Sequence, residues 1–303
     1  MKTHKFQYLA WNDLQDEQAY QDWRGLKLDN AEAAKNRNFV AVKNFENPSD
    51  SERKELILRC SRENLAGYQV ENPSDDPEET RFALRKFAGA MGLHIAEAHR
   101  SAGEAGVVAL KVSDAPKQAG YIPYTPRALS WHTDGYYNAP DDRIGAFVLH
   151  CARQALKGGE NMLLDPEIAY IRLRDENPDF IRALMHPEAM TIPANTEETP
   201  PRPESVGPVF FADPDTGRMN MRYTARTRSI AWRDDPLTEA ARQRLLDILK
   251  EGDPLALHVR LSAGQGVLNN NVLHNRTGFE NGDTPETTRL IYRVRFRNRL
   301  NEG

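Results

Sequence analysis

The sequence has little cysteine, with only Cys60 and Cys151 among its 303 residues. Two cysteines so far apart cannot form the disulfide framework of a small secreted domain, so we expect a reducing compartment. The sequence also lacks a run of eighteen apolar residues, and its first residues contain no apolar segment of the signal-peptide type. These absences argue against a membrane-spanning helix and predict a cytoplasmic protein.

The sequence lacks a strong excess of charge of either sign. It has 40 basic and 44 acidic residues, a net charge of −4, which is too balanced for a protein that binds nucleic acid or anionic lipid along its surface. We therefore expect no nucleic-acid partner and no membrane partner, and leave open whether the chain forms a homo-oligomer. Hydrophobic residues make up 39% of the chain, enough for a buried core.

The pattern of apolar residues predicts a mainly β fold with flanking helices. Residues 13–92 are helical in character, with an early strand at 38–43 and an amphipathic helix at 78–91. From residue 106 onward, short β-type runs alternate with Gly, Pro and Asn. We expect strands at 107–112, 144–151, 162–164, 209–212, 255–261, 267–268 and 290–296, and helices at 166–185 and 236–250.

This arrangement predicts one domain over residues 1–303. Residues 1–105 would form a mostly helical part packed on a barrel, and residues 106–300 would form the barrel with its inserts. Residues 195–208, rich in Pro, Glu and Thr, are typical of an exposed loop or lid. No phosphate loop, internal repeat or alternation of single strands with single helices is present, which argues against a doubly wound fold.

A short polar motif, Trp131-His132-Thr133-Asp134, contains two candidate metal ligands. In an extended chain residues i and i+2 leave on the same face, so His132 and Asp134 can offer a nitrogen and a carboxylate oxygen to one ion. His274, far downstream, is the candidate third ligand, because distant strands become neighbours in a barrel. Two histidines and a carboxylate on one face leave three positions open, as in non-haem Fe(II) oxygenases. Surface polarity for His132 and Asp134, or a core position for His274, are the alternatives.

The last predicted strand carries two arginines on one face. Leu290, Tyr292, Val294 and Phe296 alternate with Arg289, Ile291 and Arg293. Guanidinium groups bind carboxylates bidentately, so Arg289 and Arg293 can together hold a dicarboxylate. Farther along, we expect a solvated basic edge strand that includes Arg295, Arg297 and Arg299.

In combination, these motifs make residues 107–296 similar to the TauD/TfdA-type Fe(II)- and 2-oxoglutarate-dependent dioxygenases. The resemblance rests on Trp131-His132-Thr133-Asp134, Gly158-Gly159-Glu160, Gly264 with Gly266, Leu273-His274-x-Arg276-Thr277-x-Phe279, and Arg289-x-x-x-Arg293. It implies a double-stranded β-helix, or jelly roll, with Fe(II) bound by His132, Asp134 and His274. It also implies that 2-oxoglutarate and O2 are the co-substrates.

By the same resemblance Arg289 pairs with the distal carboxylate of 2-oxoglutarate, and Arg293 lies near its metal-binding end or near the substrate. Two departures stand out. Asn161 occupies the place of a usual threonine that helps to hold the co-substrate, although its amide can still donate a hydrogen bond. Three asparagines at 269–271 replace an Asp-Asn pair, which leaves open what orients the ring of His274.

The substrate is the least determined feature. Trp131, Tyr136 and Tyr137 flank the metal motif and either line the pocket, for example as a cage for a quaternary ammonium group, or pack the barrel. Arg127 and Arg222, together with Tyr223, are candidates for an acidic substrate group, although Arg222 also suits a surface strand.

We therefore expect hydroxylation of an unactivated C–H bond in a small-molecule substrate, an amino acid, betaine or sulfonate, with decarboxylation of 2-oxoglutarate to succinate. A metal-dependent hydrolase or cupin-like lyase with the same three ligands, and a non-catalytic jelly-roll binding protein, are the alternatives.

Overall fold

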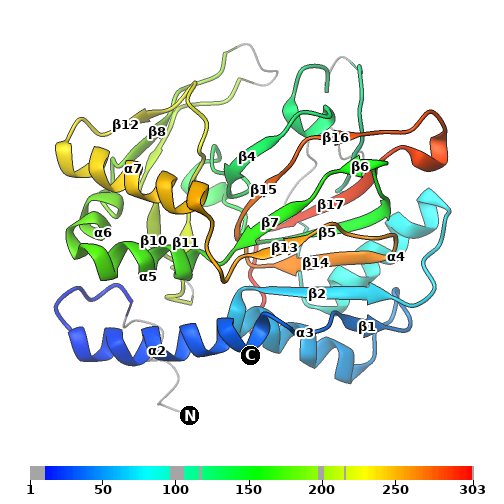
Figure 1. Ribbon diagram of the computed structural model, residues 1–303, viewed down its shortest axis with the longest axis horizontal. Coiled ribbons are helices and arrows are strands. Elements are labelled where there is room, and N and C mark those ends of the chain that lie inside the picture. Colours follow the sequence, from blue (N-terminus) through cyan, green and yellow to red (C-terminus); the bar gives the residue numbers. More distant parts are fainter. Residues whose placement is uncertain (1–10, 96–105, 116–117, 197–200, 215, 302–303) are drawn as a thin grey trace. The chain divides into compact units, whose positions relative to one another are not determined.

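The computed structural model describes residues 11–95, 106–115, 118–196, 201–214 and 216–301. Its helices and strands follow one another along the chain as Figure 1 shows. The α-helices in these ranges are α2 (Glu17–Ala34), α3 (Asp50–Glu63), α4 (Pro77–Ala90), α5 (Pro166–Glu176), α6 (Pro178–Leu184) and α7 (Pro236–Glu251). Among the described residues, no helix combines the length and the hydropathy that a membrane crossing requires.

The strands are short, as predicted, and fall into several sheets. The first half of the chain contributes β1 (Val40–Val42), β2 (Leu65–Val70), β3 (Val107–Leu110), β4 (Leu129–His132), β5 (Ala146–Arg153), β6 (Lys157–Gly158), β7 (Asn161–Leu164) and β8 (Met190–Ile192). The second half contributes β9 (Ser205–Gly207), β10 (Phe210–Ala212), β11 (Met219–Met221), β12 (Ala231–Trp232), β13 (Leu257–Val259), β14 (Gln265–Asn269), β15 (Leu273–Arg276), β16 (Phe279–Glu280) and β17 (Leu290–Phe296).

The chain divides into two compact units, each built from separate stretches of sequence. The helical unit comprises Met1–Lys35, Trp131–Arg143 and Leu164–Ala256; the sheet unit comprises Asn36–Ser130, Ile144–Leu163 and Leu257–Gly303. In the helical unit α5, α6 and α7 pack against one another (Figure 1). Trp11, Trp23 and Phe210 surround Tyr170 with edge-to-face ring contacts there.

Asp-Pro and Asn-Pro pairs set the starts of four helices. Asp76, Asp165 and Asp235 cap α4, α5 and α7, and a proline follows each of them at the first helical position. The same device divides the predicted helix at 166–185 into two. Asn177 is extended, with φ −158° and ψ 110°, because Pro178 disfavours the helical conformation in the residue before it.

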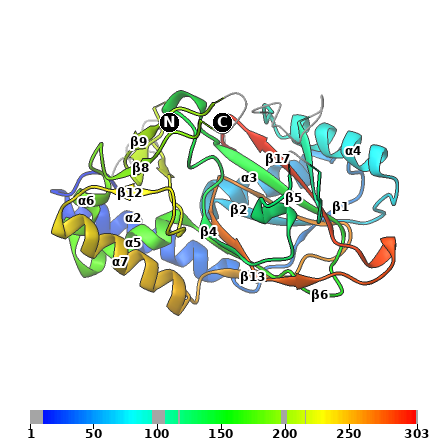
Figure 2. The same ribbon diagram turned by 90° about the horizontal axis from the view of Figure 1, so that it is seen from above.

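The sheet unit contains the jelly-roll core. Its larger sheet has the order β1-β2-β14-β5-β17-β3, and a second sheet has the order β13-β7-β15-β4. Apolar residues of β3, β5, β14 and β17 pack with Leu163 of β7 and with Leu257 and Val259 of β13, which fills the space between the sheets. Helices α3 and α4 cover the other face of the larger sheet (Figure 2). The predicted double-stranded β-helix with flanking helices is confirmed.

The described residues before 106 contain a strand that the sequence pattern did not predict. The expected strand at 38–43 is present as β1, and the expected helix at 78–91 is present as α4. In addition, β2 follows α3 directly, after Asn64 ends that helix in the left-handed conformation at φ 57°. β2 pairs with β1 and β14, so the part of the chain that we expected to pack on the barrel also extends its larger sheet.

Candidate metal centre and co-substrate site

His132 and Asp134 lie at the end of β4 and in the turn that follows it. Thr224 forms a β-bridge with His132, and the backbone N–H of Thr133 donates to Tyr223 at 3.0 Å, which fixes the chain between the two candidate ligands. Both side chains are buried, Asp134 at 2% exposure. His132 Nε2 lies 3.7 Å from Asp134 Oδ1, too far for a hydrogen bond between them. Two donor atoms this far apart can instead share one ion, since each metal bond is about 2.0–2.2 Å long.

His274 belongs to β15, and its own chain orients its ring. Its Nδ1 lies 3.0 Å from the carbonyl oxygen of Val272, so Nδ1 carries the hydrogen and Nε2 keeps its lone pair for a metal. Asn269 and Asn271 shape the preceding turn by donating to the carbonyls of Phe147 and Ile144. The asparagines that replace the usual Asp-Asn pair are therefore structural, and a backbone carbonyl is the partner that the sequence left undetermined.

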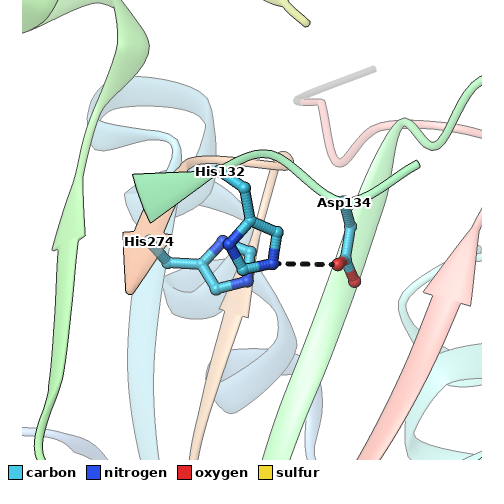
Figure 3. A group of neighbouring side chains, drawn as sticks. All are labelled: His132, Asp134 and His274. Atoms are coloured by element: carbon cyan, nitrogen blue, oxygen red, sulfur yellow. Dashed lines mark ion pairs between the residues drawn. The ribbon is translucent and has the colours of Figure 1, made fainter. Parts of the chain in front are cut away.

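One potential ligand atom from each of His132, Asp134 and His274 lies within 4.8 Å of the other two. Figure 3 shows the three side chains as neighbours. All three side chains are buried. Two imidazole nitrogens and one carboxylate oxygen suit a divalent transition metal such as Fe(II) and leave coordination positions for other ligands. The chemistry of these donors therefore fits the metal that the sequence pattern predicted.

Arg289 is a buried cation at the start of β17. Its side chain is 5% exposed, and its guanidinium lies 5.1 Å from the ring centre of Phe279. No carboxylate pairs with it within the described part of the chain. Burial lowers the pKa of Arg289 to about 10, so the residue remains charged at neutral pH. A buried guanidinium without a carboxylate is a candidate binding position for an anion.

Arg276 lies on the same phenylalanine but has partners. Its guanidinium is 4.8 Å from the ring centre of Phe279 and donates to the carbonyls of Thr125, Arg127 and Thr277. Burial and the charge of Arg289 lower the pKa of Arg276 to about 10. Of the two arginines on Phe279, only Arg289 is left for a ligand.

The Gly158-Gly159-Glu160 turn brings the backbone close to Arg289. Both glycines have positive φ, and a β-carbon at Gly158 would lie 2.2 Å from the carbonyl oxygen of Gly278. Glu160 closes the turn by accepting a hydrogen bond from Thr277 Oγ1 at 2.6 Å, which lowers the pKa of Glu160. A β-carbon at Gly159 would lie 3.4 Å from Nε of Arg289, at ordinary contact distance, so the turn lies directly beside the guanidinium, and it is the positive φ of 75° that favours glycine at this position.

Asn161 follows this turn and is buried. Its side-chain amide donates to the carbonyl oxygen of Gly159 at 3.4 Å. The amide therefore lies beside the turn that touches Arg289, but its role toward 2-oxoglutarate stays a prediction.

The expectation of a basic edge strand at the end of the chain is wrong for two of its three arginines. Arg295 and Arg299 are buried at 7% exposure, and only Arg297 is exposed. β17 pairs with β5 on one side and with β3 on the other, so it is an interior strand. Arg293 is buried in the same strand, opposite Val108 and Leu149.

An arginine guanidinium lies over the ring of each of the two tyrosines that follow the metal motif. The guanidinium of Arg226 lies 5.1 Å from the ring centre of Tyr136, and that of Arg202 lies 5.9 Å from the ring centre of Tyr137. These contacts contradict the quaternary-ammonium cage, because guanidinium groups already lie over the rings and repel a cationic ligand. The sequence alone did not single out either arginine, since both lie more than 60 residues from the tyrosines.

The other predicted substrate residues have different surroundings. Arg222 donates to the backbone carbonyls of Tyr136, Met190, Ser205 and Gly207, and burial lowers its pKa to about 10. Its guanidinium thus ties segments of the helical unit together. Trp131 is buried, which agrees with a packing role, and Arg127 is exposed.

The described part of the predicted loop at 195–208 contains paired backbone segments. Asn195 and Arg202 exchange two backbone hydrogen bonds, and β9 begins at Ser205 and pairs with β8. Residues 197–200, between the paired residues, lie outside the described part.

Comparison with known proteins gives a family and a fold. Residues 27–295 match the family described as taurine catabolism dioxygenase TauD, TfdA family. A uridine-5′-phosphate dioxygenase of Amycolatopsis sp. is 32% identical over 173 residues, which span 55% of this chain and 60% of that protein. Members of this family use Fe(II), 2-oxoglutarate and O2.

Two solved structures share the fold. A non-heme iron oxygenase, OrfP, in complex with Fe and alpha-ketoglutaric acid, has a TM-score of 0.62 at 16% identity and covers 98% of this chain and 92% of its own. An asparagine oxygenase in complex with Fe(II), 2S,3S-3-hydroxyasparagine and succinate has a TM-score of 0.61 at 15% identity and covers 88% of this chain and 83% of its own. With the family match extending over most of its length, the chain belongs to the TauD/TfdA dioxygenase family.

Proposed function

We propose that this protein is an Fe(II)- and 2-oxoglutarate-dependent dioxygenase that hydroxylates an unactivated C–H bond of a small polar metabolite. His132, Asp134 and His274 would hold the iron, and Arg289 would bind the distal carboxylate of 2-oxoglutarate. The observation that carries the proposal is that Arg289 is buried without a carboxylate partner among the described residues, in a chain that also carries the three clustered metal donors. A metal-dependent hydrolase or lyase has no need of such an anchor.

The iron, when bound with 2-oxoglutarate and O2, supplies the oxidising chemistry, with release of succinate and carbon dioxide. The protein's own groups perform different tasks. The carbonyl of Val272 holds His274 in the tautomer that can bind a metal. Burial of Asp134 and Arg289 keeps water from competing for their charges. Asn161 and Arg293, both buried, are the further residues that we assign to 2-oxoglutarate.

Single-domain organisation over residues 1–303 remains part of this proposal. His132, Asp134, His274 and Arg289 come from stretches of sequence that are far apart, and one reaction that uses all four residues requires the whole chain to act as one domain.

The relatives suggest two substrate classes. The curated relative is named for uridine-5′-phosphate, a nucleotide, whereas the solved structures contain hydroxyasparagine or arginine derivatives, which are amino acids. Both classes are small and polar, and both carry an acidic group. We therefore extend the expected panel of amino acids, betaines and sulfonates to nucleoside monophosphates.

The test begins with binding of the co-substrate. Anaerobic addition of Fe(II) and 2-oxoglutarate to the purified protein should produce a weak visible charge-transfer absorption. Arg289→Met should raise the 2-oxoglutarate concentration needed for half-maximal absorption on the order of 100-fold or more, since loss of one partner of a buried charge pair costs about 2–5 kcal/mol. His274→Ala should weaken iron binding. The exposed Arg182→Met is the matched control and should change neither.

The second step is a metabolite panel with substrate-stimulated succinate release as the readout. We expect at least one small polar metabolite to stimulate release. Absence of the charge-transfer absorption in the unmodified protein, or unchanged 2-oxoglutarate binding in Arg289→Met, would disprove the proposal.

A further inference from the structure

A tyrosine and an arginine of the helical unit lie beside the candidate metal ligand His132. The rings of Tyr136 and His132 make an edge-to-face contact, with centres 6.3 Å apart. Arg226 Nη1 donates to the Tyr136 hydroxyl at 3.2 Å while its guanidinium lies over the ring. Thr224, opposite His132 in the β-bridge, is two residues before Arg226, which places these groups close to the end of β4. The metal ligand, the tyrosine and the arginine thus form a continuous series of contacts.

The positive charge of Arg226 has no carboxylate partner among the described residues. Nη2 donates to the carbonyl of Ser229 at 2.5 Å, and Nε is buried without a hydrogen-bond partner. Arg202, over the neighbouring Tyr137, donates only to backbone carbonyls, and so do the main contacts of Arg222. Three guanidinium groups therefore surround the two tyrosines without forming an ion pair to a described acidic side chain.

The Tyr136 hydroxyl has a hydrogen left to donate. The oxygen of the hydroxyl accepts a hydrogen bond from Arg226 Nη1 at 3.2 Å. A phenol that accepts a hydrogen bond through its oxygen still has its own O–H to donate to another acceptor. Arg226 and Tyr136 together offer an N–H donor, an O–H donor and one positive charge.

We propose that the substrate of the dioxygenase carries an anionic oxygen group, such as a phosphate monoester, carboxylate or sulfonate, and that Arg226 and Tyr136 bind this group beside His132. The inference rests on the proposed function and gives its substrate a chemical class. The anion neutralises a guanidinium that the described residues leave without a counter-ion, and it accepts a hydrogen bond from the Tyr136 hydroxyl. Cationic metabolites such as betaines without a second acidic group are disfavoured.

The first experiment compares matched compounds on the full chain loaded with Fe(II) and 2-oxoglutarate. The pairs are a nucleoside 5′-monophosphate with its nucleoside, an amino acid with its amide, and an alkyl sulfonate with its alcohol. In at least one pair, kcat/KM for succinate release should be about 10- to 100-fold higher for the anionic member, as a charge-assisted hydrogen bond predicts. The pair that responds identifies phosphate, carboxylate or sulfonate as the group. A neutral or purely cationic compound that is the best substrate would overturn the inference.

The second experiment uses variants with the best anionic substrate. Arg226→Gln should raise KM about 10- to 100-fold and change kcat much less, because the contact is made before and during the reaction alike. Arg226→Lys should recover part of the loss, since it keeps the charge but not the planar fork. Tyr136→Phe should raise KM by a smaller factor. Arg242→Gln is the matched control, because Arg242 forms an ion pair with the exposed Glu239 on α7.

The outcomes separate this inference from the function on which it rests. If the unmodified protein shows no Fe(II)–2-oxoglutarate absorption, the proposed function fails, and the inference fails with it. If the absorption is present and a substrate is found, but Arg226→Gln and Tyr136→Phe leave KM for the anionic substrate unchanged while thermal unfolding shows folded variants, only the inference is wrong.

Discussion

Buried charge is handled differently in the two units of the protein. In the helical unit Lys27 is 5% exposed, and its ammonium lies 2.5 Å from Asp165 and 2.7 Å from Glu167. Burial alone would lower the pKa of Lys27, but the two carboxylates outweigh it and the pKa is raised. In the sheet unit Arg289 is equally buried, has no described carboxylate partner, and has a lowered pKa.

The sheet unit also shows a third way to bury a titratable group. Nδ1 of His150, on β5, shares a hydrogen bond of 3.1 Å with the Tyr68 hydroxyl, and the His150 ring stacks on Phe45. Burial lowers the pKa of His150 to about 4, so the ring is neutral in the folded protein. Lys27 and His150 are thus paired or neutral within the fold, whereas for the unpaired buried Arg289 we propose a ligand as the partner. Each part of this contrast can be tested by substitution.

The largest expected effect is the loss of the lysine from its paired cluster. Lys27→Met leaves Asp165 and Glu167 buried without their counter-ion, so we expect the free energy of unfolding to fall by about 3–5 kcal/mol. Urea denaturation measures the change. Arg24→Met, on the same helix, is the control, because its pair with Asp175 is about 30% exposed on both sides and should cost no more than about 1 kcal/mol. Equal losses in the two variants would contradict the contrast.

The second effect is a dependence of stability on pH that originates at His150. Its pKa is about 4 when folded and near 6.5 when unfolded, so the unfolded state binds the extra proton between these values. The contribution of the neutral His150 ring to the free energy of unfolding is therefore fully present above pH 6.5. It is lost as the pH drops toward 4, which lowers the free energy of unfolding by about 3 kcal/mol. Urea denaturation across this range should show a smaller fall for His150→Gln.

The exposed His258→Gln is the control for this measurement and should keep the full slope. Identical slopes in the unmodified protein and in His150→Gln would show that His150 is protonated without penalty in the folded state.

These contrasts also show which features the sequence could reveal. The period-2 pattern of residues 289–296 predicted β17 and the shared face of Arg289 and Arg293, because alternation is a local property of a strand. The same pattern could not show whether the arginine face of the strand meets water or the protein interior, so Arg295 was wrongly expected in solvent. β17 also pairs with strands on both sides and is not an edge strand, and the sequence of one segment does not reveal which strands it pairs with.

Within the candidate site, spacing was informative for some residues and silent for others. His132 and Asp134 share a short extended motif, and His274 lies in a motif of its own. Arg226 has no such motif, and it approaches Tyr136 from 90 residues away. β2 was missed because the first 92 residues have a helical composition, and only the left-handed Asn64 marks the change from α3 to a strand.

The smallest change in unliganded stability is expected where the buried cation has no partner. Arg289→Met removes an uncompensated charge but also its stacking on Phe279, so the free energy of unfolding should change by less than about 1 kcal/mol.

The effect of Arg289→Met on stability should appear only when the ligand is added, unlike that of Lys27→Met. Anaerobic Fe(II) with 2-oxoglutarate at a hundredfold its dissociation constant should stabilise the unmodified protein by about 2.7 kcal/mol. Arg289→Met should lose the part of this gain that depends on 2-oxoglutarate and keep the part due to iron alone, as thermal unfolding with each addition in turn would show. A large destabilisation of unliganded Arg289→Met would mean that the guanidinium stabilises the fold itself. The distinction between a buried charge with a counter-ion, such as Lys27, and a buried charge without one, such as Arg289, would then no longer hold.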